Sequence, residues 1–181
     1  MDAAWAFTVA ALLWVYLGIQ KGQVTQDGLT GLNNRRRLDQ YMWELDERSG
    51  ERETCCYLLM DVNKFKKVND TYGHVTGDEV LRLVAEQLKR TFGNMQAFLA
   101  RYGGDEFVVI VKGKTQDEMD VIIHQTQENV NAIAWGADTP WQLSISIGCA
   151  MRGEQGKQKS HELLALADER MYRQKKGIQD R

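Results

Sequence analysis

The sequence contains little proline and cysteine, and neither sign of charge dominates it. One proline, Pro140, occurs in 181 residues, so the helices expected elsewhere are uninterrupted. Three cysteines follow neither a metal-ligand spacing nor an even disulfide framework, because Cys55 and Cys56 are adjacent and Cys149 is distant. We interpret them as small core residues of a reducing compartment. The formal net charge of −2 offers no global positive field to a nucleic acid polymer, so any phosphate binding has to be local.

Charged residues are also missing from Ala3 to Ile19, near the N-terminus. This stretch is at the short end of what a helix needs to cross the hydrocarbon core, and it predicts a transmembrane helix. A buried or interfacial helix is the alternative, and a secretory signal peptide fits less well because Asp2 replaces the basic start. Lys21 and the arginines at 35–37 follow the stretch, which predicts an inner-membrane anchor with its C-terminal side in the cytoplasm.

The rest of the chain has the pattern of one domain, so we divide the sequence into residues 1–26 and 27–181. Hydrophobic periodicity predicts helices near residues 34–49, 64–72, 77–91, 115–134 and 161–175, and strands near 55–61, on each side of residue 104, and at 142–150. This order indicates an α/β (α+β) fold with a central mixed, mostly antiparallel sheet flanked by helices.

Two adjacent glycines, Gly103 and Gly104, lie between two apolar runs and precede Asp105 and Glu106. Adjacent glycines can adopt the positive φ angles of a tight turn, so the segment predicts a hairpin with two carboxylates at its tip. The carboxylates suggest a metal site, but a tip that is acidic only because it faces water explains these residues equally well.

A further acid, Asp61, follows the apolar run Tyr57 to Met60, which is short enough to be a central strand. A carboxylate at this strand end, beside the hairpin, would provide hard oxygen ligands for Mg²⁺ or Mn²⁺, with substrate phosphates completing the shell. The alternative is that Asp61 is the N-cap of the following helix.

Several motifs, in order, resemble those of the GGDEF family of diguanylate cyclases: Asp27 to Arg36, Asp61 to Asp70, Gly73 to Asp78, Arg101 to Phe107 and Ala167 to Tyr172. The resemblance implies a palm-like fold similar to that of nucleotidyl cyclases and polymerases. It also implies condensation of two GTP molecules into cyclic di-GMP and two pyrophosphates, in bacterial second-messenger signalling and biofilm formation. The alternatives are a non-catalytic module that binds GTP or cyclic di-GMP, and a cyclase that uses another nucleotide.

The resemblance also assigns roles to single residues. It implies that the divalent ions are held by Asp61, the backbone carbonyl of Val62, Asp105 and Glu106. Asp105 would also take the proton from the ribose 3′-hydroxyl, and Lys66 would stabilise the charge that builds on the phosphates.

Guanine recognition would fall to Asn69 and Asp78, whose amide and carboxylate suit the donors and the acceptor on the edge of guanine. Separately, Asn69 could be a turn former and Asp78 the N-cap of a helix that begins near Glu79. His74 resembles a residue near the substrate in this family.

The phosphates would lie over the N–H groups of a helix start formed by Asn63, Lys64 and Phe65, and Lys175 of the last helix would reach them. Asn63 departs from the aspartate that the family often has at this place.

Two more features concern control and assembly. Asn94 and Ala97 stand where many family members carry an Arg-x-x-Asp product-inhibition site, so we expect no inhibitory site here. A cyclic dinucleotide requires two GTP molecules held antiparallel, which implies a homodimer.

Overall fold

The computed structural model describes residues 7, 9–13, 25–48, 54–134, 142–153 and 158–179. Within these residues one four-stranded sheet has the order β2-β3-β1-β4, with every neighbouring pair antiparallel. The expected α+β architecture is confirmed, with an antiparallel rather than mixed sheet. Its strands are β1 (Cys55–Val62), β2 (Ala97–Gly103), β3 (Glu106–Lys112) and β4 (Ile145–Met151).

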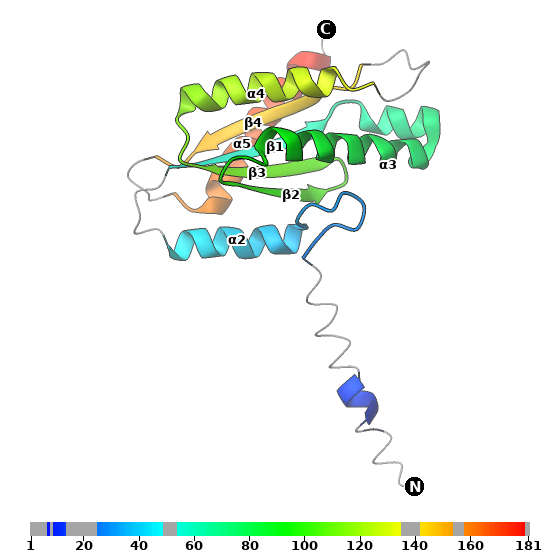
Figure 1. Cartoon of the computed structure of the whole chain (residues 1–181), viewed down its shortest axis with the longest axis vertical. Helices are drawn as coiled ribbons and strands as arrows, with labels where there is room; N and C mark the ends of the chain where they lie inside the picture. The colour runs from blue at the N-terminus through cyan, green and yellow to red at the C-terminus, as the bar shows by residue number, and fades with distance from the viewer. Residues whose placement is uncertain are drawn as a thin grey trace.

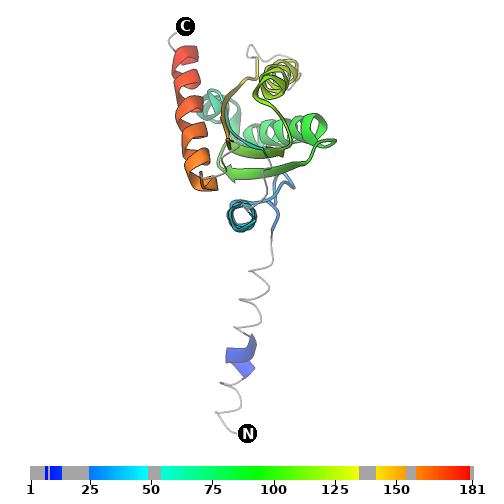
Figure 2. The same ribbon diagram turned by 90° about the vertical axis from the view of Figure 1, so that its left-hand side faces the viewer.

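Helices cover both faces of this sheet (Figures 1 and 2). They are α2 (Arg35–Glu47), α3 (Phe65–Phe92), α4 (Gln116–Asn131) and α5 (Ser160–Gln179). The core under α3 and α4 is separate from the core under α2 and α5. The two helices expected at 64–72 and 77–91 are one element, α3, with a kink at Gly73, where φ is 82°. Gly73 allows this kink because it has no Cβ to oppose a positive φ.

Strand β1 lies inside the sheet and is buried along its whole length, which explains the apolar run from Cys55 to Met60 that precedes Asp61. Because side chains alternate along a strand, each face of β1 serves one core. Its even-numbered side chains pack under α3 and α4, whereas Cys55, Tyr57 and Leu59 pack toward α2 and α5. By this alternation Asp61 also belongs to the face that α5 covers.

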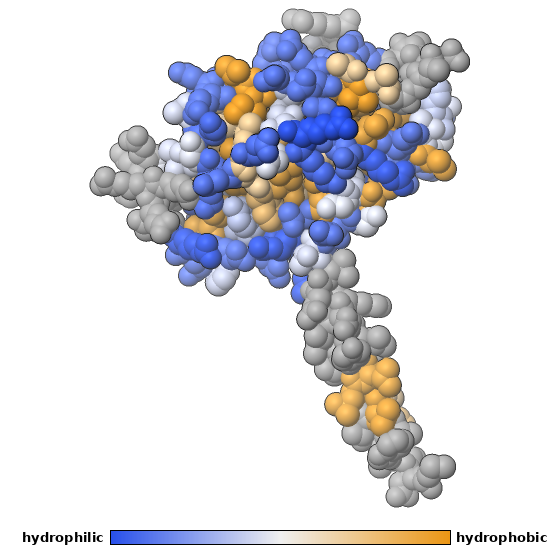
Figure 3. Space-filling view, viewed as in Figure 1, coloured by the Kyte–Doolittle hydropathy of each residue, from blue (hydrophilic) through white to orange (hydrophobic). Residues whose placement is uncertain are grey.

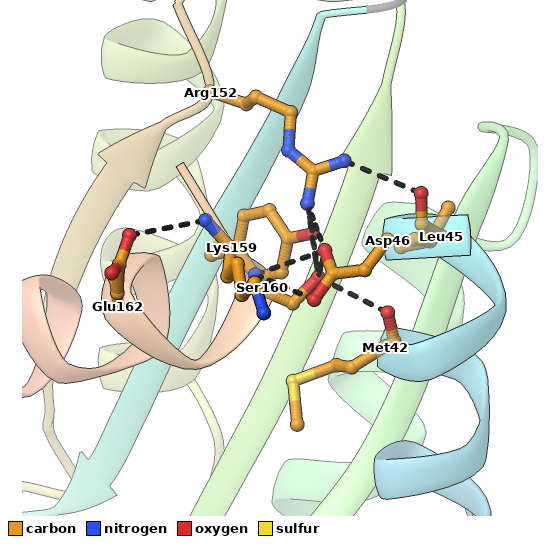
Figure 4. A network of polar contacts seen from close by, with 8 residues as sticks. Met42, Leu45, Asp46, Arg152, Lys159, Ser160 and Glu162 are labelled. Atoms are coloured by element: carbon orange, nitrogen blue, oxygen red, sulfur yellow. Dashed lines mark hydrogen bonds and ion pairs between the residues drawn. The ribbon is translucent and has the colours of Figure 1, made fainter. Parts of the chain in front are cut away.

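A buried polar network attaches α2, β1 and α5 to one another (Figure 4). Arg152, 5% exposed, follows β4 and donates from Nη2 to Asp46 Oδ1 at 2.6 Å, to Ser160 Oγ at 3.0 Å and to the Tyr57 hydroxyl at 3.2 Å. The Ser160 hydroxyl contacts Asp46 Oδ1 at 2.7 Å. Since a buried arginine is costly unless it is paired, this network fixes where α5 begins.

Helix α5 also makes a close backbone contact with β4 at Gly148. A Cβ atom at this position would lie 1.8 Å from the carbonyl oxygen of Ala167 and 2.4 Å from the amide nitrogen of Met171. Only glycine allows the two backbones to approach this closely. The contact therefore sets the distance between α5 and the sheet.

Gly148→Ala should lower the free energy of unfolding by about 3 kcal/mol, because the new methyl group pushes α5 away from β4. Urea denaturation followed by circular dichroism measures the change. Gly153→Ala is the matched control, since its Cβ would meet nothing within 4 Å, and it should change stability by less than about 0.5 kcal/mol. Equal effects of the two substitutions would contradict the close contact.

The expected N-terminal apolar helix falls mostly outside the described residues. Residues 9–13 are helical, and Phe7, Leu12 and Leu13 are exposed. This described part is hydrophobic, in contrast to the largely hydrophilic face of the domain in the same view (Figure 3). Among the described residues, every helix is too short or too polar to cross a membrane. The membrane helix at 3–19 and the division at residue 27 stay predictions.

Candidate functional site

The hairpin of β2 and β3 has a turn at Gly104 and Asp105. Gly104 has a φ of 50°, a value that favours glycine, and Gly103 pairs with Glu106 across the turn. The register shifts between Arg101 and Gly103, so the end of β2 is irregular. Glu106 is the first residue of β3, so Asp105 lies on the turn and Glu106 on the sheet.

Strand pairing brings the separately predicted acids together. Asp61 of β1 stands directly opposite Glu106 of β3, and directly opposed residues face the same side of a sheet. The amide of Val62 donates to the carbonyl oxygen of Asp105 at 3.3 Å, which holds the turn beside the end of β1. Asp61 is only 5% exposed. The hairpin acids therefore belong to a cluster with a buried member, which favours the interpretation as a site over that of a merely water-facing tip.

These carboxylates repel one another. Burial and the charge of Asp105 raise the pKa of Asp61, although a hydrogen bond from Lys175 acts in the opposite direction. Burial and the charges of Asp61, Asp105 and Asp168 raise the pKa of Glu106. A nearby cation would stabilise the charged forms of these acids, because it offsets both their repulsion and their desolvation.

A cation of the chain itself lies against this cluster. Lys175 donates from Nζ to Asp61 Oδ1 at 2.6 Å, and the two side chains are 27% and 7% exposed. The sequence predicts that Lys175 reaches the substrate phosphates, whereas here it pairs with a metal-ligand candidate. The physical reason is that a buried carboxylate is costly without a partner, and α5 passes within reach of the end of β1.

The carboxylates of this cluster suit a metal ion whose other ligands are water and substrate phosphates. Among the described residues, no group of three or more Asp, Glu, His or Cys side chains forms a metal site by itself. Mg²⁺, however, is commonly held by one or two carboxylates, water and substrate phosphates. The facing pair Asp61 and Glu106 provides such a partial shell, and the ammonium group of Lys175 occupies a cation position beside it. These residues fit Mg²⁺ or Mn²⁺.

Arg101 holds the hairpin turn in place, a role that the sequence did not reveal. Its Nε and Nη2 donate to the carbonyl oxygen of Gly104 at 3.0 and 2.8 Å, and its Nη1 donates to Asp27 Oδ1 and Oδ2, each at 3.2 Å. Asp27 also accepts hydrogen bonds from the amide and hydroxyl of Thr30. The turn is thereby attached to the segment before α2. In the sequence, the signal for this role is an arginine two residues before the paired glycines.

Arg101→Ala should raise the pKa of Asp27, which burial tends to raise but hydrogen bonds from Thr30 and Arg101 hold below its usual value. A lowered folded-state pKa stabilises the protein above the unfolded-state value, and this stability is lost as pH falls through the folded-state pKa. As pH falls, the variant should therefore lose the stability that ionised Asp27 contributes at a higher pH than wild type does. At neutral pH its free energy of unfolding should be lower than that of wild type by about 1 kcal/mol. Carbon-detected NMR titration and urea denaturation measure these effects.

Arg90→Ala removes an exposed arginine of α3 and serves as the control. It should leave the pKa of Asp27 unchanged. An Asp27 pKa that is the same in wild type and Arg101→Ala would show that Arg101 does not hold this carboxylate.

The helix start after β1 differs from the prediction in one residue. Lys64 is the N-cap of α3, with a φ of 57° and no side-chain cap, so Asp61 is not the cap. The amide of Asn63 donates to the carbonyl oxygen of Ser144 at 2.9 Å, and its side chain contacts the Ser144 and Ser146 hydroxyls. The backbone N–H of Asn63 is therefore already hydrogen-bonded to Ser144, so it does not point at a phosphate. Lys64 and Phe65 remain at the helix start.

The two candidate guanine ligands lie close together on α3. A Cβ atom at Gly77 would be 1.9 Å from Asn69 Oδ1, so the Asn69 amide lies against the residue next to Asp78. Both lie inside α3, which excludes a turn former at Asn69 and an N-cap at Asp78. Asp78 is exposed and so are Lys66 and His74, as expected of groups that meet a ligand. Their roles stay predictions.

Comparison with known proteins agrees with the motifs. Residues 24–181 match the family described as diguanylate cyclase, GGDEF domain. Two Escherichia coli K12 proteins are similar: "Probable diguanylate cyclase DgcI", 38% identical over 156 residues, and "Diguanylate cyclase DosC", 34% identical over 161 residues. These alignments cover 83% and 85% of this chain but 31% and 34% of the relatives, so the chain spans about a third of their length.

A solved structure is similar over nearly the whole chain. It is that of the coiled coil and GGDEF domain of DgcB from Caulobacter crescentus in complex with c-di-GMP, with 27% identity and a TM-score of 0.79, covering 97% of this chain and 94% of that chain. This chain belongs to the GGDEF family of diguanylate cyclases.

Proposed function

We propose that this chain is a diguanylate cyclase that condenses two GTP molecules into cyclic di-GMP and two pyrophosphates. The observation that carries the proposal is the register of β1 with β3, which sets Asp61 opposite Glu106 beside the turn residue Asp105. The names of the relatives and the c-di-GMP bound to DgcB support the same reaction class.

In this proposal the divalent ions would be held by Asp61, the Val62 carbonyl, Asp105 and Glu106. Bound Mg²⁺ or Mn²⁺ would supply Lewis-acid stabilisation of the charge on the phosphate oxygens. Asp105 accepts the proton of the 3′-hydroxyl as that oxygen attacks the α-phosphate of the other GTP and pyrophosphate leaves. Lys66, exposed in the first turn of α3, stabilises the departing charge.

Lys175 competes with a metal ion for Asp61 Oδ1. We propose that this ammonium group would contact the substrate phosphates, the role expected from the sequence. Its short ion pair with Asp61 favours the charged form of the buried carboxylate.

Substrate selection in this proposal depends on Asn69 and Asp78, with His74 nearby on α3. Guanine presents N1–H and an amine to the carboxylate, whereas adenine would present an acceptor and leave the carboxylate unpaired. One such pair orients one GTP, so the proposed active species is a homodimer in which each subunit contributes one substrate. Anchoring through residues 3–19 at the inner membrane, with this domain in the cytoplasm, is part of the same proposal.

The test is incubation of the purified chain with GTP and Mg²⁺, followed by chromatography of the nucleotides. Wild type should form cyclic di-GMP, and Glu106→Gln should reduce the rate about 100-fold or more because a metal ligand is lost. Glu86→Gln, which changes an exposed carboxylate of α3, should retain the wild-type rate. Parallel reactions with ATP test the nucleotide preference.

Thermal unfolding of the same variants separates lost chemistry from misfolding. Glu106→Gln should unfold no lower than wild type, since the substitution removes one of several repelling carboxylates. GTP or cyclic di-GMP binding without product from a dimeric preparation would favour the non-catalytic module. Undiminished product from Glu106→Gln would refute the assigned site.

Product inhibition at the turn between α3 and β2 should be missing. Asn94 is exposed there and Ala97 begins β2, so neither an arginine nor an acid is present to bind cyclic di-GMP. Wild-type activity should therefore be insensitive to added cyclic di-GMP, whereas Asn94→Arg combined with Ala97→Asp should be inhibited by it. Initial rates at increasing product concentration measure the difference, and Ala97→Asp alone is the control. Strong inhibition of wild type would contradict the expectation.

A further inference from the structure

Two cysteines that are far apart in the sequence touch in the structure. Cys56 of β1 and Cys149 of β4 lie with their sulfur atoms 3.0 Å apart, although 93 residues separate them. The sequence predicts small core cysteines of a reducing compartment, because their spacing forms no disulfide framework. The contact arises from the neighbouring positions of β1 and β4 in the sheet.

We propose that Cys56 and Cys149 form a reactive dithiol that a peroxide converts reversibly to an intramolecular disulfide. The proposal concerns a modification site and is independent of the proposed cyclase activity, because the acids lie at the other end of β1.

The sheet register explains both why the disulfide can form and why it can be reduced again. Cys56 pairs with Met151, and Cys149 pairs with Leu58, so the two cysteines are diagonal neighbours on the face that α3 and α4 cover. Diagonal positions across antiparallel strands have Cα atoms about 7–8 Å apart, slightly more than an unstrained disulfide spans. The bond would therefore form with a small strand movement, and its strain would make it easy to reduce.

The two thiols differ in ways that assign their roles. Cys149 is partly exposed, whereas Cys56 is 1% exposed. A hydrogen bond from the Cys56 thiol lowers the pKa of Cys149 against the effects of burial and of Asp120, and the charge of Arg170 contributes in the same direction. The same contact and burial raise the pKa of Cys56. The more exposed sulfur of Cys149 is thus the one that meets an oxidant first, and its lowered pKa favours the reactive form, whereas Cys56 is the resolving thiol.

The reaction balances with hydrogen peroxide as the oxidant. The Cys149 thiolate attacks one peroxide oxygen, the O–O bond breaks, and the departing hydroxide takes a proton to become water. Cys56 sulfur then attacks the resulting sulfenic acid, its proton leaves with the hydroxyl group as a second water, and the S–S bond forms. Both sulfur atoms are oxidised by one electron each, and the peroxide is reduced.

The test is brief exposure of the folded chain to hydrogen peroxide, followed by alkylation, intact-mass measurement and peptide mapping without reductant. Wild type should lose two hydrogens, contain a Cys56–Cys149 linked peptide, and regain both thiols with dithiothreitol. Cys55→Ser is the matched control, because Cys55 packs toward the opposite face of the sheet, and this variant should form the same link.

The two partner substitutions should differ from each other. Cys149→Ser should leave Cys56 reduced, whereas Cys56→Ser should let Cys149 gain oxygen without a cross-link. The proposal is overturned if wild-type Cys149 gains oxygen without a link, if the link contains Cys55, or if all three thiols stay reduced. Mapping of the wild-type chain decides the question even where a variant folds poorly.

Discussion

The structure depends on the position of β1, which pairs antiparallel with β3 on one side and β4 on the other. The first register sets Asp61 opposite Glu106 and so creates the acidic site. The second brings Cys149 against Cys56 on the opposite face. A shift of one residue in either register would turn these side chains to the wrong face, so burial of β1 on both sides protects the site.

The acidic cluster lowers the stability of the fold. Burial and neighbouring carboxylates raise the pKa of Asp61 and of Glu106, and Asp61 is nearly removed from water. Lys175 offsets part of this cost from α5. The position of α5 is in turn set by the close contact at Gly148 and by the buried network around Arg152. Gly148 and Arg152 thus determine, through the position of α5, whether Lys175 reaches the acidic cluster.

Much of the fold was predictable because local patterns agree with it. Helices α2, α4 and α5 occupy the expected ranges to within four residues at each end, and the apolar run before Asp61 is a central strand. The prediction for Asn63 failed because a long-range partner intervenes: this residue contacts Ser144 and Ser146. Lys175 pairs with Asp61, a contact that no local pattern indicates, because buried polar groups take the nearest partner that the fold offers, and its role at the phosphates stays a prediction.

The sequence by itself determined which residues could bind ions and guanine, since carboxylates, amides and paired glycines have chemistry that does not depend on the fold. It also determined the family, through motifs whose order is written along the chain. Only the tertiary structure decided which groups meet: Asp61 with Glu106 and Lys175, Arg101 with Asp27, and Cys56 with Cys149. Strand register and helix packing join residues that are distant in sequence, and local patterns carry no record of such contacts.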